Sequence, residues 1–288
     1  MGNSIYIPSK PLNTAVLFLV FNRLETTKKV FKAIRKAQPP RIYVAADGPR
    51  ENKAGELQKV RETRDYIIQN IDWECRVFTL FRENNLGCKV AVSSAIEWFF
   101  DHENQGIILE DDCLPSLSFF WFCEELLEKY KDDYRIGHIS GNNFQNGIKR
   151  GGYDYYYSIY NHIWGWASWS SRWKNYDVNL ENFDNSDFIE AMFQDKKTIK
   201  YWKDIYIKMK DKLIDTWDYQ WTFSIWKQKQ LSIIPNINLV KNIGFGVDAT
   251  HTTQETEFSN IENHEIYLKD HPDYIEQNKF ADDLTSKI

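Results

Sequence analysis

A short apolar run that ends in three consecutive carboxylates constrains this chain most. Residues 106–109 are Gly-Ile-Ile-Leu, and Glu110, Asp111 and Asp112 follow directly. The run is too short for a helix and too continuous for a half-exposed strand, which predicts a buried strand of a parallel sheet covered on both faces. The carboxylates would then lie at the carboxyl end of the strand, where open α/β sheets bind ligands.

Three adjacent acids repel one another unless a cation offsets their charge. Carboxylate oxygens suit Mg²⁺ or Mn²⁺, and these ions typically join a carboxylate to the phosphates of a nucleotide. The acidic segment therefore indicates a metal-diphosphate site. The alternative is a solvated acidic turn.

The rest of the N-terminal half predicts an α/β fold, because strand and helix patterns alternate strictly. The predicted strands cover 15–21, 41–46, 76–80 and 106–110, and the predicted helices cover 25–37, 54–70 and 87–102. Such repeated βα units favour a parallel sheet with helices on both faces. The turn at 83–87 suits either capping of the following helix or binding of a phosphate at its N-terminus.

The organisation changes after a helix over 115–129 and a strand over 135–141. Residues 153–173 are dense in Tyr and Trp without a helical period, which favours a strand and loop lining a cleft, with an aromatic core as the alternative. Residues 182–211 have a polar helical pattern. Another helix is expected from 215, capped by Thr216 or Asp218, and the polar residues from 252 suggest a surface tail.

Composition excludes several classes of protein. The net charge of -5 and the pI near 5.8 argue against a nucleic-acid partner. No stretch is long and apolar enough to span a membrane, and the first residues have no signal-peptide pattern, so we expect a cytoplasmic protein. Peripheral contact with a membrane stays open. Aromatic residues make up 16% of the chain, which is compatible with sugar binding as well as with core packing.

With these segments in view, the chain resembles glycosyltransferases of the GT-A fold. It is most similar to family 13, the inverting N-acetylglucosaminyltransferases that start complex N-glycans, and to their bacterial relatives. The resemblance rests on residues 108–112, on Phe21-Asn22-Arg23, on Asp47-Gly48, on Trp164-Gly165-Trp166 and on Trp217-Asp218.

The resemblance implies a role for each donor-side motif. Asp112 would ligate Mn²⁺, or Mg²⁺ in its place, and Glu110 and Asp111 would contact the sugar and ribose of a UDP-sugar. Arg23 would lie against the diphosphate, and the Asp47 carboxylate would accept a hydrogen bond from the uracil. His251 matches, more weakly, a histidine near the metal and the donor phosphates.

On the acceptor side, the resemblance implies that Asp218 is the catalytic base. The family pattern has a second Asp where this chain has Tyr219, which leaves Asp215 as a rival. Residues 1–141 would form the nucleotide-sugar half of the domain, 142–251 the half that binds a carbohydrate or glycolipid acceptor, and 252–288 a tail. Two alternative functions are a metal-dependent phosphohydrolase and a non-catalytic carbohydrate-binding protein.

Overall fold

The computed structural model describes residues 6–183, 186–245 and 261–287. Its strands are β1 (Val16–Val20), β2 (Arg41–Ala46), β3 (Arg76–Phe81), β4 (Gln105–Glu110), β5 (Cys113–Pro115), β6 (Ile136–Ser140), β7 (Tyr155–Ser158), β8 (Trp166–Trp169), β9 (Leu231–Pro235) and β10 (Val240–Asn242). Its helices are α1 (Leu24–Ala37), α2 (Glu56–Asn70), α3 (Gly87–His102), α4 (Ser118–Tyr130), α5 (Ser170–Trp173), α6 (Asp187–Met192), α7 (Lys196–Lys210), α8 (Asp218–Lys227) and α9 (Lys279–Thr285).

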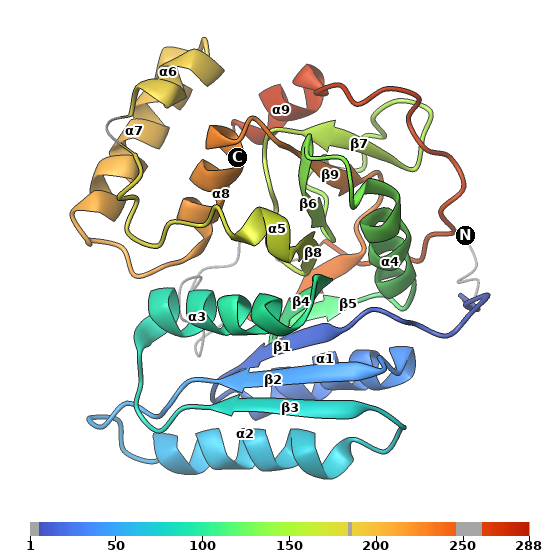
Figure 1. The fold of residues 1–288 in the computed structure, drawn as a ribbon, viewed down its shortest axis with the longest axis vertical. Helices are drawn as coiled ribbons and strands as arrows, with labels where there is room; N and C mark the ends of the chain where they lie inside the picture. Colours follow the sequence, from blue (N-terminus) through green and yellow to red (C-terminus); the bar gives the residue numbers. More distant parts are fainter. Residues whose placement is uncertain (1–5, 184–185, 246–260, 288) are drawn as a thin grey trace.

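Eight of the strands form one sheet, in the order β3-β2-β1-β4-β8-β6-β9-β7 (Figure 1). β1 pairs in parallel with β2 and β4, and β2 pairs in parallel with β3. β8 lies antiparallel between β4 and β6, and β7 lies antiparallel to β9. The predicted α/β fold is confirmed, and the predicted parallel sheet holds for the first four strands in the chain.

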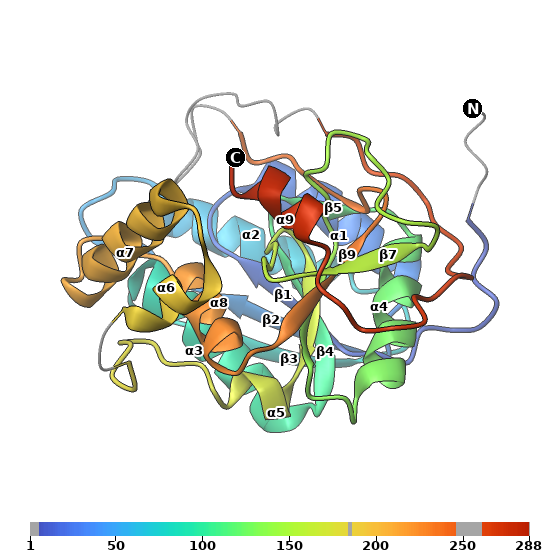
Figure 2. The same ribbon diagram turned by 90° about the horizontal axis from the view of Figure 1, so that it is seen from above.

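Helices cover both faces of the sheet (Figure 2). Successive side chains of β1 alternate between the faces, as a strand requires. Phe18 packs in the core beneath α1, α2 and α4, and Leu17 packs in the core beneath α3, α7 and α8. The continuous apolar run of β1 therefore reflects burial on both sides.

The aromatic segment 153–173 forms β7, β8 and α5 and belongs largely to the core. Trp166 of β8 is fully buried, and its ring lies 5.7 Å from that of Trp217 and 6.0 Å from that of Trp221. For these rings the aromatic-core alternative holds, and the expected cleft lining is wrong.

The polar helical pattern over 182–211 contains two helices where one was expected. α6 ends at Phe193, whose backbone is extended, and α7 starts anew after Asp195. The Asp195 carboxylate accepts from the Thr198 N–H at 2.8 Å, which caps α7. A local capping residue thus interrupts a pattern that periodicity alone reads as continuous.

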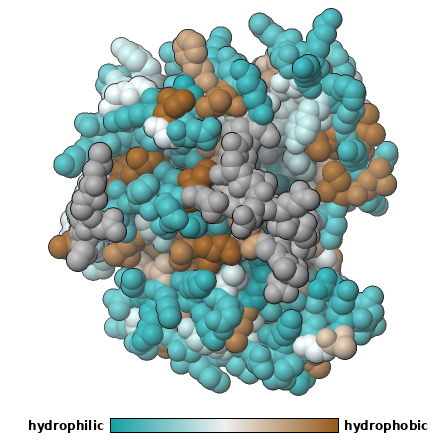
Figure 3. Space-filling model, turned by 180° about the vertical axis from the view of Figure 1, so that it is seen from behind, coloured by the Kyte–Doolittle hydropathy of each residue, from teal (hydrophilic) through white to brown (hydrophobic). Residues whose placement is uncertain are grey.

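The described part of the C-terminal segment, 261–287, is fixed to the outer edge of the sheet. Asn278 donates its backbone N–H to the Tyr157 carbonyl at 2.8 Å, and Asp282 of α9 accepts from the Ser158 hydroxyl. Seen from behind, the surface is mainly hydrophilic with apolar residues in small groups (Figure 3). Within the described ranges, none of the helices has the length and apolar character that crossing a membrane requires.

Candidate active site

Three carboxylates and one guanidinium meet at the carboxyl end of β4. Arg23, the residue before α1, donates through Nη2 to Asp111, and the same nitrogen lies 3.0 Å from Asp112 Oδ2. Asp111 is the most deeply buried of these side chains, and Glu110 ends β4 itself. The structure thus brings together four of the residues predicted to bind the donor and its metal.

The acidic segment carries more negative charge than Arg23 can offset. Burial and the charges of Asp112 and Asp111 raise the pKa of Glu110 above its usual range. Burial also raises the pKa of Asp111, although Arg23 opposes that shift. Asp111 Oδ2 is buried and has no hydrogen-bond partner in the described part of the chain. A further positive charge would therefore be stabilised here.

A divalent cation fits this distribution of charge. Across residues 6–183, 186–245 and 261–287, no three His, Cys, Asp or Glu side chains are grouped to hold a metal ion by themselves. Mg²⁺ commonly needs only one or two carboxylates, because substrate phosphates and water supply its other ligands. The partly exposed carboxylate of Asp112 is available as such a ligand.

The segment after β10 closes over Asp112. The Ile243 N–H donates to the Asp112 carbonyl at 2.8 Å, and β10 pairs antiparallel with β5. A Cβ atom at Gly244 would overlap Asp112 Oδ2, so glycine is required for this close approach. His251, predicted to lie near the metal, falls outside the described residues.

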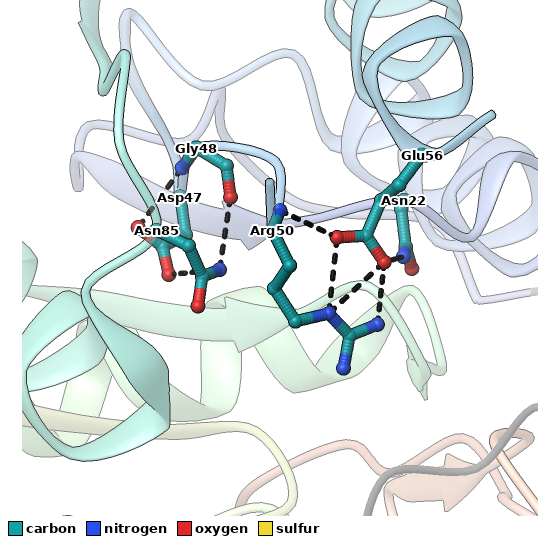
Figure 4. A network of polar contacts seen from close by, with 6 residues as sticks. All are labelled: Asn22, Asp47, Gly48, Arg50, Glu56 and Asn85. Atoms are coloured by element: carbon teal, nitrogen blue, oxygen red, sulfur yellow. Dashed lines mark hydrogen bonds and ion pairs between the residues drawn. The ribbon is translucent and has the colours of Figure 1, made fainter. Parts of the chain in front are cut away.

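Asp47, predicted to contact the uracil, lies after β2 and binds the turn before α3 (Figure 4). Its Oδ1 accepts from the N–H groups of Gly48 and Leu86 at 2.9 and 3.0 Å. Its Oδ2 accepts from the Asn85 amide at 2.8 Å and from the Gly87 N–H at 3.2 Å. The carboxylate therefore fixes β2 relative to α3. Its role in recognising a nucleoside stays a prediction.

A second carboxylate caps α3 from the other half of the chain. Asp215 accepts from the N–H groups of Cys88 and Lys89, each at 3.0 Å, with a different oxygen for each bond. These bonds and those of Asp47 satisfy the free N–H groups at the helix start. Of the two possibilities for the 83–87 turn, the structure therefore favours capping over phosphate binding.

Asp218 begins α8, but its carboxylate does not cap the helix. The N-cap is Trp217, which makes no side-chain capping bond, so the predicted capping by Thr216 or Asp218 is wrong. The Thr216 hydroxyl instead donates to Asp218 Oδ1. Asp218 Oδ2 has no hydrogen-bond or ion-pair partner among the described residues, which leaves it available to a substrate hydroxyl.

The Cys88 thiol marks the point toward which the predicted acids converge. Burial raises its pKa, and four carboxylates add to the shift, namely Glu110, Asp215, Asp218 and Asp47 in decreasing order. Asp47 follows β2 and Glu110 ends β4, whereas Asp215 precedes α8 and Asp218 begins it. Asp47 and Asp215 thus contact the first turn of α3, and the charges of Glu110 and Asp218 also act on its Cys88.

Sequence reasoning missed a network beside these acids (Figure 4). Glu56, buried at the start of α2, accepts from the Arg50 backbone N–H at 2.7 Å and from the Asn22 amide at 2.9 Å, and it also pairs with the Arg50 guanidinium. Because Asn22 directly precedes Arg23, the network fixes the chain that carries the guanidinium. No local pattern connects residues so far apart, so the sequence offered no signal for it.

The Trp-Gly-Trp motif divides between core and site. Gly165 has a φ of +68°, and a Cβ atom there would lie 2.9 Å from Val240 and 3.1 Å from Leu109. Trp166 is buried in the core, whereas Trp164 is partly buried with its ring 5.8 Å from Phe245. Trp164 is therefore the aromatic residue of this motif that lies near the segment covering Asp112.

Comparisons with known proteins show distant similarity of fold. No protein-family model matches the chain, and no curated protein matches its sequence. The chain is similar to the structure of GalNAc-T7 with UDP, GalNAc and Mn²⁺, with 14% identity, a TM-score of 0.47, and coverage of 79% of this chain and 43% of that one. For S. aureus TarS the identity is 8% and the TM-score 0.42, with coverage of 80% of this chain and 59% of that one. For the galactosyltransferase LgtC the identity is 11% and the TM-score 0.37, with coverage of 74% of this chain and 70% of that one. This chain thus spans less than two thirds of GalNAc-T7 and of the TarS chain, and similarity at this level says nothing about its activity.

Proposed function

We propose that this protein is a glycosyltransferase that moves a sugar from a UDP-sugar, with a GlcNAc-like donor favoured, to a hydroxyl of a carbohydrate or glycolipid. The observation that carries the proposal is the position of Asp218. One of its carboxylate oxygens has no partner among the described residues, and its charge contributes to the raised pKa of Glu110, by less than burial, Asp112 and Asp111 raise it and by less than Arg23 lowers it. The acids at 110–112 are proposed to bind the donor, and Asp218 is proposed to act on the acceptor.

On the donor side, Asp112 is the proposed metal ligand, with His251 nearby. A bound divalent cation would neutralise charge that develops on the leaving diphosphate. Arg23 adds positive charge at the same place, and Glu110 and Asp111 are proposed to contact the sugar and ribose. Residues 1–141 accordingly form the donor half of the proposed enzyme.

On the acceptor side, Asp218 is the proposed general base. Its free oxygen takes the proton of the acceptor hydroxyl while that oxygen bonds to the anomeric carbon, and the bond from the same carbon to the diphosphate breaks. Attack from the face opposite the leaving group inverts the anomeric configuration. The rival, Asp215, has both oxygens engaged by backbone N–H groups, so the contacts favour Asp218.

Two other functions are less well supported. A phosphohydrolase with two metals needs a larger set of ligands than the described residues group together. A binding-only protein gives no reason for the Asp218 oxygen that is left without a partner among the described residues. The aromatic content, which could suggest sugar binding alone, is largely accounted for by the core.

The direct test is turnover of a panel of UDP-sugars by the purified protein, with Mn²⁺ and with a chelator. We expect slow release of UDP from one donor in the presence of Mn²⁺, and faster release when the correct acceptor is added. NMR of the product should show inversion at the anomeric carbon. Retention would refute the role of Asp218, and release of phosphate from simple phosphate esters would favour the phosphohydrolase.

A further inference from the structure

Helix α7 lies at one end of the molecule (Figures 1 and 2), and its exposed residues include several lysines. Its inner side packs against the rest of the protein, because Ile205, Tyr206 and Met209 are buried in the core. The segment 196–213 contains seven lysines and two aspartates, hence a local charge of +5 in a chain whose net charge is -5. This segment is therefore positively charged in a molecule whose net charge is negative.

Several of these lysines have no partner within the protein. Lys200 pairs with Asp204, and Lys203 pairs with Glu190. Lys196, Lys197 and Lys208 are exposed and make no side-chain hydrogen bond or ion pair with the described residues. The unpaired cations thus lie on the outer side of the helix, free to meet an external anionic surface.

Large apolar side chains are exposed among these lysines. Tyr201 and Ile207 of α7 are 52% and 53% exposed, and Leu213, just beyond the helix, is 71% exposed. From behind, the end of the molecule that carries α6 and α7 shows apolar atoms among hydrophilic ones (Figure 3). Exposed apolar side chains between unpaired lysines are typical of a surface that enters the headgroup region of an anionic membrane.

We propose that the outer face of α7, with Leu213, binds peripherally to membranes that contain anionic phospholipids. The lysines would lie among the headgroups, and Tyr201, Ile207 and Leu213 would insert shallowly between them. A protein groove that engulfs an amphipathic helix would need the apolar face of α7, which is already buried. Nucleic acid would neutralise the lysines but gives no reason for the exposed apolar side chains.

The test measures binding to vesicles in the absence of donor and metal, so its outcome does not depend on the proposed sugar transfer. Phosphatidylcholine vesicles with and without phosphatidylglycerol are sedimented with the full chain at low and high salt. We expect binding only to the anionic vesicles, and weaker binding at high salt. Each lysine near such a surface strengthens binding about five-fold, so the variant K196Q/K197Q/K208Q should bind about a hundred-fold more weakly.

Helix α1 supplies a matched control. Lys29, Lys32 and Lys36 are likewise exposed and have no side-chain partner among the described residues, but α1 exposes no large apolar side chain. The variant K29Q/K32Q/K36Q should bind vesicles within about two-fold of the wild type. I207S/L213S should weaken binding at high salt in particular, where apolar insertion contributes most.

Three outcomes would overturn the proposal. They are equal binding to neutral and anionic vesicles, equal losses in the α1 and α7 lysine variants, and binding to duplex DNA that is as tight as binding to anionic vesicles. Thermal unfolding of every variant should match the wild type, because each substituted side chain is exposed. A variant that unfolds early is replaced by the single substitutions of its set.

Discussion

The indole Nε1 of buried Trp221 donates a hydrogen bond of 3.1 Å to Nδ1 of buried His138. The other ring nitrogen of His138, Nε2, lies 3.0 Å from the His162 carbonyl and donates to it in the same neutral tautomer. The imidazole also stacks on Trp166, with ring centroids 5.0 Å apart. A neutral histidine therefore joins α8, which carries Asp218, to the centre of the sheet.

This arrangement predicts that the contribution of His138 to stability decreases in mild acid. Burial lowers the pKa of His138 from 6.5 to about 3, so the unfolded chain binds a proton between these values that the folded chain does not. The contribution of neutral His138 to stability is therefore complete above pH 6.5 and falls by about 1.4 kcal/mol per pH unit between there and the folded-state pKa. The variant His138→Gln should be less stable than the wild type at pH 7. The difference between their free energies of unfolding should be smaller by about 2 kcal/mol at pH 5. Denaturant unfolding at both pH values checks this, and a constant difference would contradict it.

Asp218→Asn should separate catalysis from binding. The amide keeps the size of the side chain and can still accept from Thr216, but it cannot take a proton from the acceptor. We expect transfer to fall by about 10²–10⁴ while UDP affinity and the melting temperature stay unchanged. Initial rates and calorimetry on the same preparation measure both quantities.

Asp215→Asn is the matched control for that variant. One amide oxygen can replace only part of the capping of α3, so we expect a loss of about 1 kcal/mol in stability. Transfer should fall much less than in Asp218→Asn. If Asp215→Asn abolishes transfer and Asp218→Asn does not, the assignment of the base is wrong.

Asp112→Asn should weaken binding of UDP with Mn²⁺. The amide is a poorer metal ligand, and it leaves Arg23 with one carboxylate fewer. We expect UDP affinity in Mn²⁺ to fall at least ten-fold to the level that wild type shows with a chelator, an effect of about 1.4 kcal/mol or more. Equal UDP affinity in wild type with and without Mn²⁺ would show that the site uses no metal.

Asp47 requires a test that distinguishes architecture from recognition. Asp47→Ala leaves the N–H groups of Leu86 and Gly87 without their acceptor, so stability should drop by about 1–3 kcal/mol. Asp47→Asn keeps one acceptor oxygen and should be milder. A loss of UDP affinity in a fully folded Asp47→Asn would support the nucleoside contact, and unchanged affinity would leave Asp47 a purely structural residue.

Sequence patterns predicted the structure correctly where residues close together in the chain determine it. The continuous apolar runs before Arg23 and Glu110 predicted both the strands and the charged residues at their ends, because burial on two faces leaves a clear signature. The first turn of α3 was different. Its capping by Asp215 joins residues 127 apart, and no periodicity encodes a hydrogen bond at that separation. The prediction for the aromatic residues was wrong for a related reason. The sequence alone does not distinguish a tryptophan of the core, such as Trp166, from one that binds a sugar.

The place of β8 in the sheet has a consequence for synthesis on the ribosome. In the sheet that the described residues form, β8 lies between β4 and β6, and its Trp166 and Ala167 pair with both strands. A nascent chain that has emerged as far as β6 therefore has one open edge on β4, which already pairs with β1, and two open edges on β6, whose partners β8 and β9 follow later. Open edges of this kind invite pairing with other chains. These edges remain open until β8, and then β9, have been translated, and binding of the nascent chain by a chaperone over that interval would prevent such pairing.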